Sequence, residues 1–232
     1  MSSLKRVISM LFQRGKSSAS KMFMEKNHFG FEPTSFDGSE HVFGAGTPVQ
    51  SVPEAYSYEK FLPPVLNQGQ ESICVPCSVS AYLNWRENLS TGSKNDNKID
   101  YYELYGARKD KVDGMTYKEA FHYLRHHGVT SNAGVLKIRE YALVRSSLQL
   151  KLALVINGPC FGALPVYSDR DDFWNKYPGD DFYGYHAVSI VGYGKDGFII
   201  RNSWGSSFAQ NGYTLLKYED FPKLLEIWTV ID

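Results

Sequence analysis

The spacing of apolar residues divides the chain into a helical part followed by a β-rich part. Apolar residues at helical spacing predict a helix from Ser72 to about Asn88, with Ser72 as the N-cap residue. The same pattern predicts three more helices, over residues 100–109, 117–127 and 146–156. Beyond them, short apolar runs separated by Gly, Asp and Asn predict strands, which are CFGALPVY, YHAVSIVGYG, GFIIRNSW, GYTLLKY and EIWTVID.

Two parts of unlike secondary structure predict an α+β fold with two lobes and a cleft between them. The length of 232 residues is enough for one domain of this kind. We assign residues 52–232 to this domain, with about 68–145 forming a mainly helical lobe and about 146–232 a mainly β lobe.

Residues 1–51 form an N-terminal extension of different composition. Its first 24 residues contain five basic residues and no acidic one, and residues 29–48 are rich in Gly, Ser and Pro without periodicity. Three interpretations stay open at this point. The extension is a flexible leader, a basic targeting segment, or a segment that occupies the cleft and restrains activity.

The overall composition excludes several classes of protein. Lys plus Arg and Asp plus Glu each number 25, so no basic excess favours nucleic acid as a partner. No apolar run approaches the ~20 residues of a membrane-spanning helix. The three cysteines are too few, and odd in number, for a disulfide framework. We therefore expect a reducing intracellular setting such as the cytoplasm, with no nucleic acid partner and no integral membrane segment.

Two of the cysteines, Cys74 and Cys77, form a C-x-x-C pair at the start of the first predicted helix. A redox pair of this kind needs a βαβ frame, but prolines at 63 and 64 stand where its leading strand should be. A metal pair needs two further ligands at suitable spacing. Cys160 is isolated, and the histidines at 122, 126 and 127 form no matching motif. We therefore expect no metal and no cofactor, with a redox protein as the weaker alternative.

A cysteine acting alone as a nucleophile needs a base, a group that orients the base, and donors for the oxyanion. The sequence offers a candidate for each of these roles. His186 begins a predicted strand and could act as the base, while Asn202 could orient its ring. Gln68 supplies an amide donor just before the cysteine pair, and Trp204 could shield the histidine from water.

These pieces resemble the papain-like (family C1) cysteine peptidases. The matching segments appear in the family's order and are VPEAY, PPVLNQG, DGMTYKEAFHYLRHHGV, YHAVSIVGYG and IIRNSWGSSFAQNGY. The last two are specific, since the Asn of N-S-W-G follows the His of H-A-V by 16 residues. The resemblance covers the chain from about Val52 to Asp232. It implies the two-lobed papain fold, with a helical lobe and a β-barrel-like lobe, and hydrolysis of protein or peptide substrates.

The resemblance also indicates which thiol is the nucleophile. Gln68 lies six residues before Cys74, which is the spacing of papain-like enzymes, but nine residues before Cys77. We therefore assign the nucleophile to Cys74, and we expect Cys77 and Cys160 to be buried small side chains. Glu71 stands where the family has a disulfide-forming cysteine, which agrees with a reducing compartment.

The resemblance implies a role for each remaining residue. Cys74 and His186 would form a thiolate–imidazolium pair, and the Gln68 amide would hold the oxyanion together with the Cys74 backbone N–H. Asn202 would orient the imidazole ring. The substrate-binding residues implied by the family are Gly114, Met115 and Thr116 on one wall of the cleft and Gly184 and Tyr185 on the other, together with Trp204.

The chain departs from the family pattern in two places. Only 112 residues separate Cys74 from His186, compared with about 130–150 in papain-type enzymes. The extension of residues 1–51 also lacks the strong helical period of the family's propeptide. A catalytically silent papain-like fold that serves as a binding module therefore remains an alternative to a peptidase.

Overall fold

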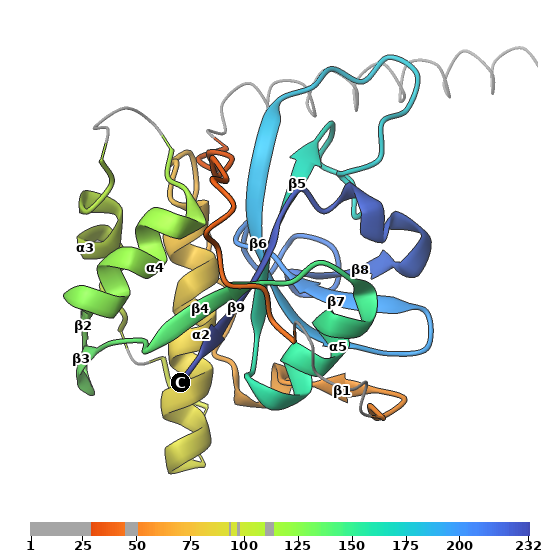
Figure 1. The fold of residues 1–232 in the computed structure, drawn as a ribbon. Coiled ribbons are helices and arrows are strands. Elements are labelled where there is room, and N and C mark those ends of the chain that lie inside the picture. The colour runs from red at the N-terminus through yellow and green to blue at the C-terminus, as the bar shows by residue number, and fades with distance from the viewer. Residues whose placement is uncertain (1–28, 45–50, 93, 97, 110–113) are drawn as a thin grey trace, which may run out of the picture.

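The structure is a computed structural model that describes residues 29–44, 51–92, 94–96, 98–109 and 114–232. Helix α2 runs along the junction between a helical lobe and a β-rich lobe (Figure 1). The helical lobe contains α2 (Cys74–Thr91), α3 (Tyr101–Gly106), α4 (Tyr117–His126) and the hairpin of β2 (Val129–Ser131) and β3 (Gly134–Leu136). In the part of the chain that the structure describes, no helix has the length and apolarity needed to cross a membrane.

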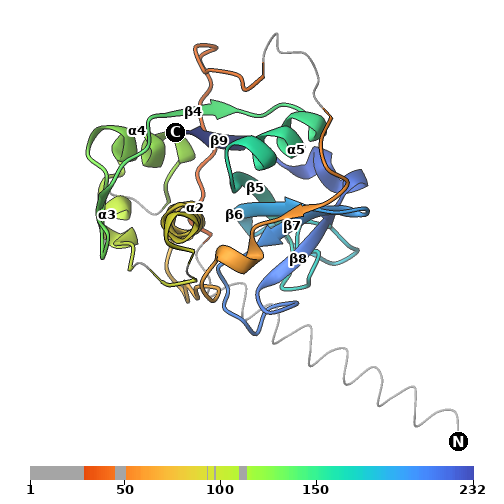
Figure 2. The same cartoon turned by 90° about the horizontal axis from the view of Figure 1, so that it is seen from below.

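The β-rich lobe is built on one antiparallel sheet in the order β4-β9-β5-β6-β7-β8, and the short strand β1 also pairs with β6. Helix α5 packs against this sheet (Figure 2). The elements of the lobe are β1 (Tyr56–Ser57), η1 (Glu59–Phe61), β4 (Glu140–Leu143), α5 (Ser147–Ile156), β5 (Cys160–Val166), β6 (Gly184–Tyr193), β7 (Gly197–Arg201), β8 (Tyr213–Lys217), η2 (Tyr218–Lys223) and β9 (Ile227–Ile231). The α+β class and the two unlike lobes are as predicted.

Helix starts show where local sequence signals decide the structure. Thr116 and Glu119 form a capping box at the start of α4, with Glu119 N donating to Thr116 Oγ1 at 3.0 Å. The prediction that Ser72 caps α2 is wrong, because Ile73 occupies the N-cap position and no side chain caps the helix. Helix α2 therefore begins at Cys74 with its first backbone N–H groups free of a side-chain cap.

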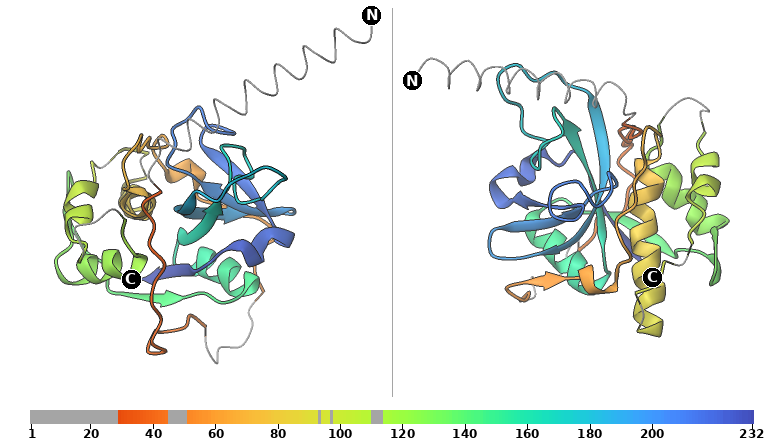
Figure 3. Two further views of the ribbon diagram at one scale, coloured as in Figure 1. Left: turned by 90° about the horizontal axis from the view of Figure 1, so that it is seen from above. Right: turned by 180° about the vertical axis from the view of Figure 1, so that it is seen from behind.

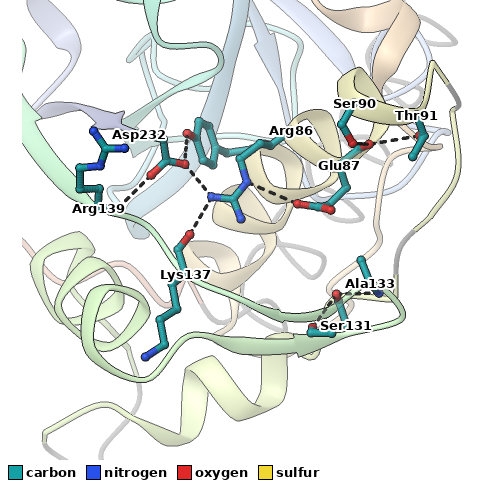
Figure 4. A network of polar contacts seen from close by, with 11 residues as sticks. Arg86, Glu87, Ser90, Thr91, Ser131, Ala133, Lys137, Arg139 and Asp232 are labelled. Carbon is teal, nitrogen blue, oxygen red and sulfur yellow. Dashed lines mark hydrogen bonds and ion pairs between the residues drawn. The ribbon is translucent and has the colours of Figure 1, made fainter.

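The C-terminus is fastened to α2 by a polar network (Figure 4). Arg86 donates to Asp232 Oδ2 at 2.6 Å and to the Lys137 carbonyl at 2.7 Å. The second Asp232 oxygen accepts from Arg139 N at 2.9 Å. These contacts fix the end of β9, and β9 in turn positions β4, which the sequence pattern does not predict as a strand.

Residues 29–44, called the strap below, cross between the two lobes (Figures 1 and 3). At one end, Met115 N donates to the Gly30 carbonyl at 2.9 Å, and Glu32 N donates to the Met115 carbonyl at 3.0 Å. At the other end, Phe43 N and the Leu143 carbonyl are 2.8 Å apart, so that the strap pairs with the outer edge of β4. The rest of the predicted extension, residues 1–28 and 45–50, lies outside the described residues.

Tyr117 connects the two lobes through its hydroxyl group. Its side chain is fully buried, and the hydroxyl lies 3.1 Å from Ser78 Oγ on α2. The same oxygen lies 3.0 Å from the Gly162 carbonyl on β5 and 3.1 Å from the Val188 carbonyl on β6. One buried polar group thus links α4 to α2 and to two strands of the sheet.

We expect Tyr117→Phe to lower the free energy of unfolding by about 1–3 kcal/mol, because buried polar partners lose their hydrogen bond. Tyr102→Phe is the matched control, since Tyr102 is 52% exposed and its hydroxyl bonds only to Glu71 in the described structure. Urea unfolding followed by tryptophan fluorescence measures both variants. Equal stability of the two variants would contradict a linking role for the Tyr117 hydroxyl.

Candidate active site

Cys74 is the first residue of α2 and is completely buried. Burial raises the pKa of its thiol to about 12, although the backbone N–H groups of Ala187, Gly30 and Val75 act in the opposite direction. Ala187 directly follows His186 on β6. The sulfur of Cys74 therefore lies between the start of α2, the beginning of β6 and the strap.

Among the described residues, the His186 side chain makes one hydrogen bond. Its Nε2 lies 2.7 Å from Asn202 Oδ1, and the same oxygen accepts from Ser203 N at 2.7 Å. Because an amide oxygen only accepts, His186 Nε2 is the donor. Its Nδ1 is buried and has no hydrogen-bond partner in the described part of the chain. This nitrogen is consequently the one left to exchange a proton with a thiol.

An aromatic layer keeps water from the His186–Asn202 bond. Trp204 stacks on the imidazole, with ring centroids 4.8 Å apart and planes 30° apart. Phe173 packs 4.9 Å from Trp204 and 5.9 Å from His186 between ring centroids. Burial lowers the pKa of His186 to about 4, while the hydrogen bond to Asn202 works against this shift. With Cys74 and His186 both buried, the neutral thiol and neutral imidazole are favoured.

Gln68 is locked to the loop that carries Asn202. Its Oε1 accepts from Ser203 Oγ at 2.6 Å, and its backbone N donates to the Ser203 carbonyl at 2.8 Å. Its Nε2 donates one hydrogen to the Glu71 carbonyl at 2.8 Å. An amide nitrogen has two hydrogens, so one N–H remains for an oxyanion. Sequence reasoning missed the role of Ser203, although this residue lies inside the N-S-W-G motif.

The residues predicted to bind substrate differ from one another in what they contact. Met115 is buried, and both its backbone groups bind the strap. Gly114 has φ of 101°, which suits glycine. The Thr116 side chain caps α4, so it serves that helix. Tyr185 is partly buried on β6 and packs on Phe182, with ring centroids 5.1 Å apart. Trp204, in contrast, lies behind the imidazole.

The strap covers the site at closest range through Phe29 and Gly30. The Phe29 ring lies edge-on to His186 and Trp204, with centroids 6.0 Å and 5.9 Å away. A Cβ atom on Gly30 would lie 2.0 Å from the Ser72 carbonyl oxygen, which is backbone and cannot rotate away. Only glycine fits at this point of the strap. No local periodicity in the sequence signals this fit.

The other two cysteines and the three histidines at positions 122, 126 and 127 are not part of the proposed catalytic set. Cys77 and Cys160 are buried and free, as predicted, and burial raises the pKa of both thiols. The histidines on α4 and at its C-cap, at positions 122, 126 and 127, are exposed. Among the described residues, no cluster of three or more His, Cys, Asp or Glu side chains could hold a metal ion.

Comparison with known proteins identifies the family of the chain. The profile of the papain family of cysteine proteases matches residues 74–223. The chain belongs to the papain family of cysteine proteases. It is 32% identical over 116 residues to macrodontain-1 of Ananas macrodontes, covering 45% of this chain and 53% of that protein. It is 26% identical over 191 residues to mouse cathepsin J, covering 67% and 57% respectively. The chain thus spans little more than half the length of these two relatives.

Solved structures show the same fold. Xylellain, a cysteine protease from Xylella fastidiosa, superposes with a TM-score of 0.74 at 20% identity, covering 88% of this chain and 96% of that one. Procathepsin B of Trypanosoma congolense gives 0.72 at 17% identity, covering 90% and 88%. The predicted papain-like fold is confirmed.

We expect the His186 imidazole to be neutral at about pH 5.5 in the full chain, because its pKa lies near 4 rather than at the ordinary 6.5. The 1H–15N NMR spectrum of the ring nitrogens distinguishes neutral from cationic imidazole, and His186→Gln assigns the signal. A cationic His186 at about pH 5.5 would contradict a dry, uncharged site.

Proposed function

We propose that this protein is a cysteine peptidase that cleaves peptide bonds through Cys74, and that the strap holds it inactive. The observation that carries the proposal is the His186 ring. It is fixed on one side by Asn202 at 2.7 Å and has a free Nδ1 on the other. Cys74 at the start of α2 and the clamped Gln68 amide supply the remaining groups of an acyl-transfer site.

Catalysis would begin when His186 takes the proton of Cys74. The thiolate attacks the carbonyl carbon of the substrate, and the oxyanion that forms accepts from the Gln68 amide and the Cys74 backbone N–H. His186 then gives its proton to the leaving amine, and the C–N bond breaks. Water, deprotonated by His186, hydrolyses the thioester and restores the thiol. Asn202 keeps the imidazole oriented through both proton transfers.

The strap would restrain this chemistry in two ways. It occupies the backbone groups of Met115, which an extended peptide substrate would use. It also keeps water from Cys74, and desolvation favours the neutral thiol over the thiolate. When the strap leaves, hydration of the site and the free N–H groups at the start of α2 would both favour the thiolate. Departure of the strap would therefore free the cleft for substrate and favour the ionised form of Cys74.

The bonds between the strap and Met115 indicate the class of substrate. Gly30 and Glu32 bind Met115 through backbone atoms alone, in a parallel bridge centred on Phe31. A segment that binds in this way is extended, and its side chains are free to vary. We therefore propose extended, unfolded peptide segments as substrates.

Two alternatives make different predictions. A catalytically silent binding module would keep the cleft and lack turnover, although the set of Cys74, His186, Asn202 and Gln68 is complete. A Cys74–Cys77 redox pair would need a βαβ frame, whereas the fold is papain-like and both cysteines are free in the structure. The observations favour the peptidase.

Gly30→Val tests the proposal, because its added side chain would meet the Ser72 backbone and displace the strap. At about pH 5.5, we expect Gly30→Val to cleave an unfolded protein substrate at least about tenfold faster than the unaltered chain. Ser35→Ala is the matched control, since Ser35 is exposed on the same strap. It should have unaltered activity.

The same assay distinguishes the thiols. In the Gly30→Val background, Cys74→Ala should abolish cleavage, with a loss of at least about a thousandfold, while Cys77→Ala should retain it. Loss of activity in Cys77→Ala alone would reverse the assignment of the nucleophile. A folded Gly30→Val variant without any cleavage would favour the binding module.

A further inference from the structure

Glu226 is a buried carboxylic acid beneath the strap. It immediately precedes β9, is 5% exposed, and its backbone carbonyl accepts from Ala163 N on β5 at 3.2 Å. Oε1 of its side chain accepts from Thr34 Oγ1 of the strap at 3.0 Å. Oε2 is buried without a hydrogen-bond partner among the described residues. The strap therefore supplies the hydrogen bond to a carboxyl group that is otherwise poorly satisfied.

The surroundings of Glu226 contain little to balance a negative charge. On β9, the Trp228 indole lies near enough to lower the pKa of the carboxyl group, as does Thr34 on the strap. On α4, the buried Tyr117 hydroxyl interacts electrostatically with it. Arg145 lines the same cavity of about 610 Å3 beside the strap. None of these groups forms an ion pair with Glu226 in the described structure, and burial raises its pKa to about 7.

Of the elements that enclose Glu226, the strap is the one that can leave without unfolding the sheet. An ionised carboxylate at this position would be desolvated, and its nearby donors among the described residues are Thr34 of the strap and the Trp228 indole, whereas a protonated carboxyl group is tolerated. We propose that Glu226 is a pH-sensitive latch, which holds the strap over the active site when protonated and releases it when ionised. This inference rests on the restraining role proposed for the strap.

The direction of the effect follows from the two states of Glu226. In the covered state its pKa is about 7, whereas the ordinary value is 4.5. Covering is therefore favoured in full below about pH 4.5, and this contribution is lost progressively as the pH rises to about 7. Each unit by which the two pKa values differ changes the ratio of covered to open molecules about tenfold.

A second anchor of the strap provides a control that does not titrate in this range. Glu40 accepts from Lys118 at 2.9 Å, and this bond holds the pKa of Glu40 below its ordinary value. Asp37 lies 3.7 Å from the same ammonium group, and hydrogen bonds from Ser39, with a smaller contribution from Lys118, hold its pKa below the ordinary value. Both acids stay charged between about pH 5 and 8, so they hold the strap equally throughout.

Hydrogen exchange of the full-length Cys74→Ala variant tests the latch without relying on turnover. The Glu32 and Met115 amides are hydrogen-bonded only across the strap, so their protection factors report covering. Between about pH 5 and 8, we expect these factors to fall at least about tenfold. Adding Glu226→Gln, which keeps the Thr34 bond and cannot ionise, should leave them within about threefold. Adding Glu40→Gln should lower protection at every pH and retain the slope.

Thr34→Val changes a residue of the strap and leaves Glu226 and the rest of the sequence unaltered. It removes the hydrogen bond to Glu226 and should reduce the protection factors of the Glu32 and Met115 amides about fivefold at about pH 5. Protection that is independent of pH in the Cys74→Ala chain would overturn the latch alone. An unaltered pH dependence after Glu226→Gln, or unaltered protection after Thr34→Val, would also overturn it. Absence of protection at every pH would overturn both the latch and the covering role of the strap.

Discussion

The close approach of the Gly30 backbone to the Ser72 carbonyl sets how deeply the strap lies against the start of α2. Because a Cβ atom at this point would come within 2.0 Å of the carbonyl oxygen, the strap can lie this deep in the cleft only as glycine. Its depth brings Phe29 over His186 and completes the burial of Cys74. The same strap also binds the backbone of Met115 and donates a hydrogen bond to the buried Glu226.

Water has opposite effects on the two halves of the catalytic set. Its exclusion strengthens the bond between His186 and Asn202, which Trp204 shields from the inner side. Its exclusion from the outer side, by the strap, disfavours the charged thiolate and imidazolium that catalysis needs. In the proposed peptidase, a strap that can leave on one side and a fixed aromatic layer on the other would allow an oriented imidazole and a nucleophile whose ionisation changes, in the same site.

Much of this arrangement could be predicted from the sequence, because its signals are local. Residues 74, 186, 202 and 68 lie in motifs of fixed spacing, and Thr116 marks the start of α4 by its capping box. Strand β4 could not be predicted, since it is defined by pairing with β9 near the other end of the chain. The position of the strap depends on the close fit of Gly30 against Ser72, and the ionisation of Cys74 depends on its burial. Neither leaves a periodic pattern in the sequence.

The most direct test of the account is to map a thiol-reactive epoxide by mass spectrometry on the full chain and on its Gly30→Val variant. At about pH 5.5, the account predicts rapid labelling of Cys74 in Gly30→Val and labelling slower by at least about tenfold in the unaltered chain. Cys77 and Cys160 should stay unlabelled in both, because their side chains are buried. Equal labelling of Cys74 in the two chains would contradict control by the strap, and a label on Cys77 would contradict the assigned nucleophile.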